Sequence, residues 1–106
     1  MRDYAAARRA VWYRENGVCL LCGGGLHQVH HRQGRGGDDP HRLSNVIGLC
    51  RSCHDHAHAH PSESYGYGVM IPRLGVRTPE EAAIRTRHGW VYLDNIGSMT
   101  PYRKAS

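Results

Sequence analysis

The sequence predicts a small α+β domain in which a two-stranded hairpin is followed by a helix. The chain of 106 residues fits one domain with a modest core, since it has 13 Gly and no Phe. Two Cys-x-x-Cys pairs bracket the middle of the chain, Cys19 with Cys22 and Cys50 with Cys53. Short strand-like segments lie between the pairs and a helix-compatible segment begins at the second pair, which gives the order strand, strand, helix.

An N-terminal helix is expected over residues 4–15. Asp3 can cap its first turn, and small or apolar residues recur at helical spacing up to Val11. Asn16-Gly17 supplies a left-handed stop. Arg14 is expected on the outer surface of this helix, together with the other arginines of the segment.

The hairpin is expected to pair residues 29–32 with residues 45–49, which returns the chain to the second cysteine pair. Residues 34–40 between them are rich in Gly and Asp and end in Pro, a composition typical of a loop. Residues 52–60 are compatible with a helix, and Pro61 is expected to end it.

Residues 63–106 are expected to form a C-terminal appendage with an extended tail, attached to a core of about residues 17–62. Within it we expect a break at residues 65–68, the start of a short helix at Thr78, and a strand at residues 90–93. The sequence shows no internal repeat and no linker. Residues 1–106 are therefore treated as a single domain.

The four cysteines indicate one closed metal site formed by Cys19, Cys22, Cys50 and Cys53. Four thiolates complete a tetrahedron around zinc and leave no open position, so the zinc would be structural. Zinc binding contributes about 10–16 kcal/mol in small finger peptides, comparable with the roughly 5–15 kcal/mol net stability of a typical domain. A redox disulfide and another metal such as iron are the alternatives, but paired cysteines in a reducing compartment favour metal ligation.

Histidines form a second group of candidate ligands. His30 and His31 are adjacent on a predicted strand and therefore point to opposite sides, which predicts different roles for them. His54 and His58 are one helical turn apart, so both can face the hairpin. One imidazole of the His30–His31 pair would join them as a metal ligand, and the other would stay free near the metal.

Together these residues resemble the HNH endonuclease family, the ββα-metal or His-Me finger nucleases, in the treble-clef-like version with a four-cysteine zinc site. The resemblance runs from Cys19 to about His60, and its motifs are Cys-x-x-Cys, Val29-His30-His31-Arg32, Gly36-Gly37-Asp38, Leu43-Ser44-Asn45-Val46 and Leu49-Cys50-x-x-Cys53-His54. It implies a zinc-stapled ββα-metal fold and an HNH nuclease domain.

The resemblance also assigns roles to individual residues. It implies that His31 is the general base and that Asn45 braces the loop carrying it. His30 and His54 would bind a catalytic divalent metal, which could be Mg²⁺, Mn²⁺, Ni²⁺ or Zn²⁺. His58 resembles an extra ligand found one helical turn later in colicin-type DNases.

The charge balance favours a polyanionic partner. The formal net charge is +5, with 14 Lys and Arg against 9 acidic residues. Four zinc-bound thiolates and one Zn²⁺ would remove only two positive charges, so the basic balance persists. DNA is the expected partner, and the residues expected to hold its phosphates are Arg32, Arg35, Arg42 and Arg51.

The expected function is therefore a metal-dependent DNA endonuclease that nicks or cuts with weak sequence specificity. The alternative is a non-catalytic zinc-knuckle module that binds DNA or a protein, although such a module requires neither His31 nor Asn45. By analogy with small stand-alone bacteriophage proteins that work beside the packaging terminase, phage terminase subunits are also expected partners.

The sequence has no apolar run of the 18 or so residues that span a membrane and no signal-type N-terminal stretch. We therefore expect no membrane association and a cytoplasmic location, which is the host cytoplasm for a phage protein.

Overall fold

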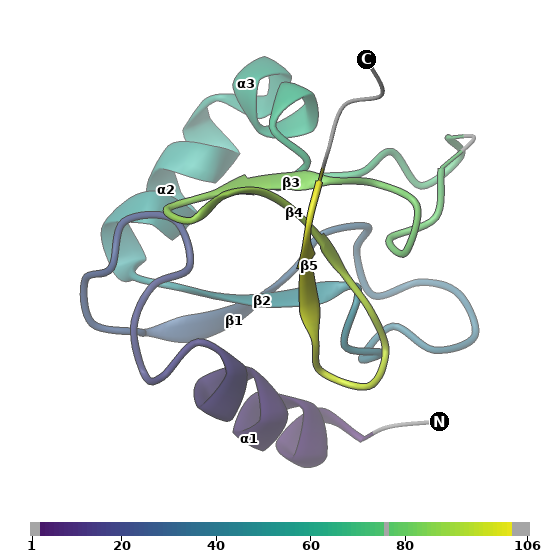
Figure 1. Ribbon diagram of the computed structural model, residues 1–106. Helices are drawn as coiled ribbons and strands as arrows, with labels where there is room; N and C mark the ends of the chain where they lie inside the picture. Colours follow the sequence, from purple (N-terminus) through teal and green to yellow (C-terminus); the bar gives the residue numbers. More distant parts are fainter. Residues whose placement is uncertain (1–2, 76, 103–106) are drawn as a thin grey trace.

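The computed structural model describes residues 3–75 and 77–102 and shows an α+β fold with two small antiparallel sheets (Figure 1). The elements in chain order are α1 (Tyr4–Arg14), β1 (Gln28–His31), β2 (Val46–Leu49), α2 (Arg51–Ala59), α3 (Pro61–Gly66), β3 (Ile84–Thr86), β4 (Gly89–Leu93) and β5 (Met99–Pro101). None of the helices in these two ranges combines the length and apolar character needed to cross a membrane.

Helix α1 has the two ends that the sequence predicted. The backbone N–H of Ala6 donates to Asp3 Oδ1 at 2.7 Å, so Asp3 caps the first turn. Asn16 and Gly17 follow the helix with φ values of 58° and 72°, the left-handed conformation that stops it. Val11 is fully buried and packs in a cluster with Val29 and Val46, which seats α1 on the hairpin.

Arg14 is buried, whereas the sequence analysis placed it on the outer surface of the helix. Its side chain is only 4% exposed and pairs with the fully buried carboxylate of Glu15, with Arg14 Nε donating to Glu15 Oε1 at 2.6 Å. The guanidinium also donates to the carbonyls of Leu43 and Val46, and Glu15 accepts from the Gly48 N–H. The buried ion pair therefore forms hydrogen bonds with backbone groups of β2 and of the segment before it. These bonds compensate its burial and attach α1 to the hairpin.

The hairpin and the helix after it follow in the predicted order, with boundaries shifted by one residue. Strand β1 pairs antiparallel with β2, which places His30 opposite Ile47 and His31 opposite Val46. Strand β2 is buried along its whole length. It leads directly into Cys50, the N-cap of α2, so the hairpin delivers the second cysteine pair to the start of the helix.

Helix α3 was not predicted. Pro61 ends α2, as expected, but it also begins α3, because its fixed φ suits the first position of a helix. Ser64 Oγ donates to the carbonyl of Ala57 at 2.8 Å and to that of His60 at 2.9 Å, which fixes the corner between α2 and α3.

The expectation of a C-terminal appendage with an extended tail was wrong for the described part of residues 63–106. Strands β3, β4 and β5 form a three-stranded antiparallel sheet that lies across the hairpin (Figure 1). Buried Ile84, Val91 and Leu93 belong to the same core cluster as Ile47 and Leu49 of β2. The hairpin needs this sheet because β2 is buried on both of its faces.

Thr78 starts a capped turn and not the short helix that was expected. The Glu81 carboxylate accepts from the Thr78 N–H at 3.0 Å and from its hydroxyl at 2.9 Å. The chain then runs into β3, so no further helical turn follows.

Candidate functional site

The four cysteines converge at the edge of the hairpin. Cys19 and Cys22 lie in the turn after α1, while Cys50 and Cys53 lie at the start of α2. Their four sulfur atoms lie within 4.8 Å of one another, and those of Cys22 and Cys50 are 3.6 Å apart. A tetrahedral site with Zn–S distances of about 2.3 Å places its sulfurs about 3.8 Å apart, so the cluster could hold a structural metal such as zinc.

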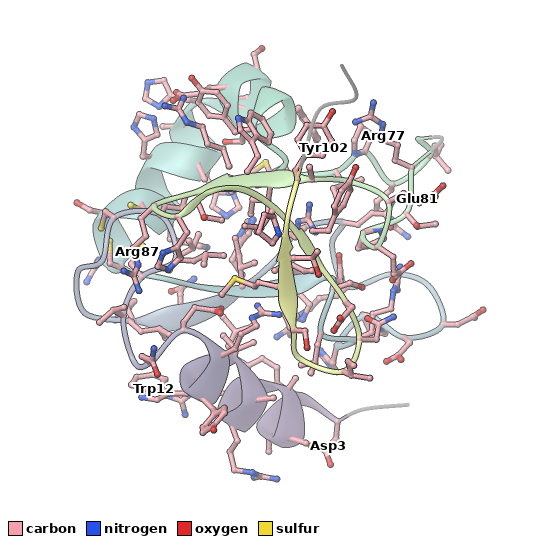
Figure 2. The ribbon with its side chains drawn as sticks, in the orientation of Figure 1. Asp3, Trp12, Arg77, Glu81, Arg87 and Tyr102 are labelled. Carbon is pink, nitrogen blue, oxygen red and sulfur yellow. The ribbon has the colours of Figure 1, made fainter. Side chains whose placement is uncertain are left out.

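The surroundings of the sulfurs also suit a bound cation. Backbone N–H groups of Gly24 and Cys53 donate to the sulfurs of Cys22 and Cys50, each at 3.4 Å. Burial and the neighbouring thiols raise the pKa of Cys53, because further negative charge is unfavourable there. A divalent cation would remove this penalty. Figure 2 shows Arg87 beside the first cysteine turn, where its backbone N–H donates to the Leu20 carbonyl at 3.1 Å.

A second group of possible metal ligands is formed by three histidines. His30 of β1 lies close to His54 and His58 of α2. One ring nitrogen from each residue lies within 4.8 Å of the others, so the three could hold a metal ion. The Nε2 atoms of His54 and His58 are 3.1 Å apart, and the His30 ring lies 5.6 Å from each of their rings. Helix periodicity places the two α2 residues on one face, as the sequence predicted.

A hydrogen bond to the backbone orients His30 for this role. Its Nε2 lies 3.0 Å from the Val69 carbonyl oxygen, which can only accept, so Nε2 carries the proton and Nδ1 keeps its lone pair. Metal-binding histidines commonly donate their other N–H in this way. Burial lowers the pKa of His30 to about 4, against the effect of the Val69 hydrogen bond, and burial also lowers the pKa of His54. Both rings are therefore neutral at neutral pH, the form in which imidazole binds metals.

His31 lies on the opposite side of β1, beside the loop that follows the strand. The ring is half-buried, and its Nε2 lies 2.9 Å from His41 Nδ1. The ring of Tyr4 stacks on it with the two ring centroids 6.3 Å apart. Burial, together with the nearby positive charge of Arg35 and the rings of His41 and His30, lowers the pKa of His31 to about 4. His31 is therefore a neutral imidazole with one nitrogen bonded to His41.

Asn45 fastens that loop to the hairpin. Its side chain is buried, and its Oδ1 accepts from the Gln33 N–H at 2.8 Å. Its Nδ2 donates to the carbonyls of Gly34 at 3.1 Å and Pro40 at 2.9 Å, near the two ends of the loop. These three bonds hold in place the loop that presents Arg35 and His41 to His31.

Arg32 does not lie where it could hold a phosphate, so that expectation was wrong. Arg32 is 2% exposed, and its guanidinium donates only to backbone carbonyls. The four acceptors are Gly68 at 2.9 Å, Ser44 at 2.8 Å, Pro79 at 3.1 Å and Ala82 at 2.7 Å. Arg32 therefore joins the hairpin to the segments before β3 and is unavailable to DNA.

The other three arginines differ in their availability. Arg35 is exposed, with its guanidinium 5.2 Å from the ring of Tyr4. Arg51 is also exposed, 4.0 Å from Asp55. Arg42 donates to Glu80 at 2.7 Å and to the Asp39 carbonyl, so its charge is already paired. The structure therefore leaves Arg35 and Arg51 open to a phosphate.

Two features of the site were absent from the sequence interpretation. His41 was not among the candidate residues, because nothing in its spacing shows that the loop folds back onto His31. The backbone carbonyl of Val69 was missed because it lies in an irregular segment far from His30 in sequence. Proximity in the folded chain is the only signal for either contact.

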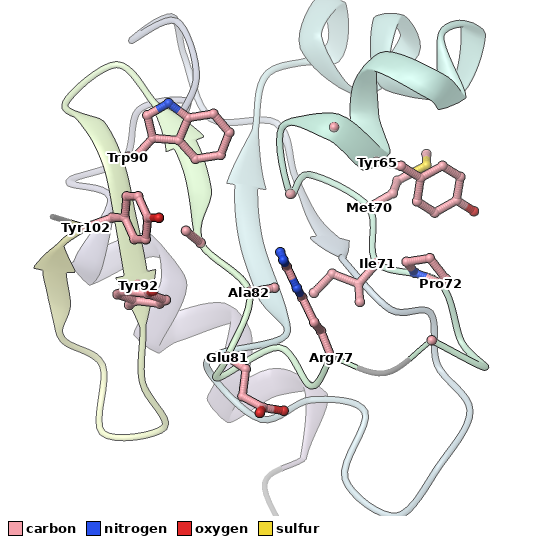
Figure 3. A pocket seen from close by; sticks show the side chains of 14 residues that line it. Tyr65, Met70, Ile71, Pro72, Arg77, Glu81, Ala82, Trp90, Tyr92 and Tyr102 are labelled. Atoms are coloured by element: carbon pink, nitrogen blue, oxygen red, sulfur yellow. The ribbon is translucent and has the colours of Figure 1, made fainter. Parts of the chain in front are cut away.

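A sizeable cavity lies away from the cysteines and histidines. It has a volume of about 800 Å³ and is bordered by β4 and by the segments around Met70 and Arg77 (Figure 3). Trp90, Tyr92 and Tyr102 line it, and neither the cysteines nor the histidines do. We do not take this cavity as the candidate functional site, because none of the candidate metal ligands of the cysteine and histidine clusters lines it.

Comparison of the chain with known protein families, with curated proteins and with solved structures shows no match.

Proposed function

We propose that this protein is an HNH-type endonuclease that hydrolyses DNA phosphodiester bonds with one divalent metal. The observation that supports this best is the convergence of His30 with His54 and His58, next to His31 on the same strand. The assignment of β1, β2 and α2 to a ββα-metal fold, with treble-clef-like zinc binding, belongs to the same proposal. The order of the three elements and the position of the four cysteines support it.

The three imidazoles suit a metal that keeps open positions. Three nitrogen ligands do not complete a tetrahedral or octahedral shell, so water and a phosphate oxygen can enter. A divalent metal bound there would supply positive charge beside the reacting phosphoryl group and the leaving oxygen. Imidazole ligands favour zinc or nickel over magnesium, although availability in the cell also decides which ion binds.

His31 is proposed to take the proton from the attacking water. In the tautomer where His31 Nε2 donates to His41, the Nδ1 atom of His31 keeps a lone pair for that water. The low pKa of His31 ensures that the lone pair is present at neutral pH. An anionic phosphate near the ring would raise this pKa towards neutrality, which strengthens the base when substrate is bound.

The remaining residues position this chemistry. Asn45 holds the loop that carries His41 and Arg35, so the environment of His31 is fixed before substrate arrives. Arg35 is exposed beside Tyr4 and His31, where it can attract a phosphate. The proposed zinc at the four cysteines would join the turn after α1 to the start of α2, which also carries His54.

Cleavage of supercoiled plasmid tests the proposal. The zinc-loaded protein is treated with a mild chelator, dialysed, and supplied separately with Mg²⁺, Mn²⁺, Ni²⁺ and Zn²⁺. We expect nicked or linear product only when a metal is added, and loss of the product when His54 and His58 are both replaced with Ala. A folded protein that binds DNA but produces no cleavage with any metal would contradict the proposal and favour a binding module.

A further inference from the structure

The histidines of α2 and its C-cap form two separate pairs. They occupy every second position, His54, His56, His58 and His60, and helical residues four apart share a face while residues two apart do not. His54 and His58 face the hairpin, where they meet His30. We propose that the other pair, His56 and His60, forms with Glu63 of α3 a second, independent binding site for a divalent transition metal.

The three proposed ligands are already close together. One ligand atom from each lies within 4.8 Å of the others. The rings of His56 and His60 are stacked with centroids 4.1 Å apart and an angle of 21°. His56 Nε2 lies 2.9 Å from Glu63 Oε2, so one nitrogen and one carboxylate oxygen point at each other across the corner between α2 and α3.

The hydrogen bonds of the ligands leave suitable atoms for a metal. His60 Nδ1 is 3.0 Å from the carbonyl oxygen of His56, so Nδ1 carries the proton and Nε2 keeps its lone pair. This is the orienting contact that metal-binding histidines usually make. A metal bound between His56 Nε2 and Glu63 Oε2 would replace the hydrogen bond that joins them, with the ring proton of His56 then on Nδ1.

The corner that carries the ligands is fixed before any metal binds. Pro61 restricts the backbone between His60 and Glu63, and Ser64 bonds to the carbonyls of Ala57 and His60. Little conformational entropy is then lost on binding, because the two helices need not move relative to each other. His56 and Glu63 are 55% and 44% exposed, so an ion reaches them directly from solvent.

The ligand set selects the class of ion. Two imidazoles and one carboxylate suit zinc, nickel, cobalt or copper, whereas magnesium prefers oxygen ligands. Three ligands leave positions for water, so this site exchanges its metal more readily than the four-cysteine cluster. A metal here binds only the folded state and therefore stabilises the corner between α2 and α3.

Nickel binding by the zinc-loaded, full-length protein tests this proposal. To remove the other histidine cluster, the measurements use His54→Asn/His58→Asn as the parent protein, and DNA cleavage plays no part. Calorimetry should then show one Ni²⁺ per chain, and the melting temperature should rise by roughly 10–20 °C at about one hundred times the dissociation constant.

Adding His56→Asn or Glu63→Gln to the parent should weaken nickel binding substantially. The loss should exceed the 10- to 100-fold loss that is typical when a residue that only hydrogen-bonds to a metal ligand is replaced. The matched controls are His27→Asn and His88→Asn, which remove exposed histidines outside the cluster and should leave binding unchanged. Circular dichroism confirms the fold of each variant. Equal nickel binding and equal thermal shifts in the parent and in both ligand variants would overturn the proposal.

Discussion

Replacing Arg32 with Ala should destabilise the fold, although the residue lies in a motif that would otherwise suggest DNA contact. Its guanidinium donates to four backbone carbonyls from three different segments of the chain. Burial lowers the pKa of Arg32 to about 10, with a contribution from Arg14 and against that of Glu80, so the side chain stays charged at neutral pH.

The magnitude follows from these contacts. Hydrogen bonds to a charged group contribute about 1.5–3 kcal/mol each, so four give an upper limit of roughly 6–12 kcal/mol. The desolvation of the guanidinium offsets part of this, and contacts in one network do not add. We expect Arg32→Ala to lower the free energy of unfolding by about 4 kcal/mol, a large share of the roughly 5–15 kcal/mol of a typical domain.

Urea unfolding of zinc-loaded protein, followed by circular dichroism, measures this loss. Arg35→Ala is the matched control, because Arg35 is exposed and its removal should change the free energy of unfolding by no more than about 0.5 kcal/mol. Arg32→Lys should recover less than half of the loss, since one ammonium group cannot reach carbonyls on several sides. Equal midpoints for Arg32→Ala and Arg35→Ala, with weaker DNA binding only for Arg32→Ala, would refute this reasoning.

Three further predictions concern the zinc cluster, acid stability and DNA affinity. Cys50→Ala, or zinc removal by a strong chelator, should unfold much of the chain in circular dichroism; a variant with wild-type melting would exclude a structural metal there. Burial raises the pKa of Glu80, but hydrogen bonds from Ser44, Arg42 and Asn95 lower it to about 2, so its stabilising effect is complete above pH of about 4.5 and is lost as the pH falls towards 2. Glu80→Gln should therefore flatten the decline of stability in that window, and an unchanged decline would contradict the assignment. DNA affinity should fall linearly with salt on logarithmic axes, and Arg35→Ala and Arg51→Ala should each reduce the slope by about 1, whereas unchanged slopes would show that neither residue contacts phosphate.

The parts of the fold with local signals were predictable from the sequence. Asp3 and Asn16-Gly17 mark the ends of α1 through capping and left-handed backbone, both of which depend on adjacent residues. The hairpin and α2 follow from strand-like segments, a glycine-rich loop and the second cysteine pair. The histidine pair His54 and His58 could be placed on one face because helix periodicity is regular.

The parts that depend on distant contacts were not predictable. Strands β3 and β5 have only three residues each, too few to show a periodic pattern, and their role in the core depends on β2. Pro61 marks the end of one helix and the start of another, and its identity alone does not separate the two cases.

The burial of two arginines was the main error of the sequence-based predictions. A sequence gives no indication that Arg14 and Arg32 are buried, because the carbonyl groups that accept their hydrogen bonds lie 12 to 50 residues away. In a chain without Phe, these long side chains fill space between segments and satisfy carbonyls that regular structure leaves open.

The proposed roles of the two adjacent histidines are tested most directly by measuring metal binding and plasmid cleavage together for His31→Ala and His54→Ala. His31→Ala should bind the catalytic metal as the wild type does and cleave roughly 10²- to 10⁴-fold more slowly, because only proton transfer is lost. His54→Ala should bind the metal more weakly and regain part of its activity at high metal concentration. Loss of metal binding in His31→Ala, or wild-type cleavage by that variant, would contradict the assignment of His31 as the base and of His30, His54 and His58 as the metal ligands.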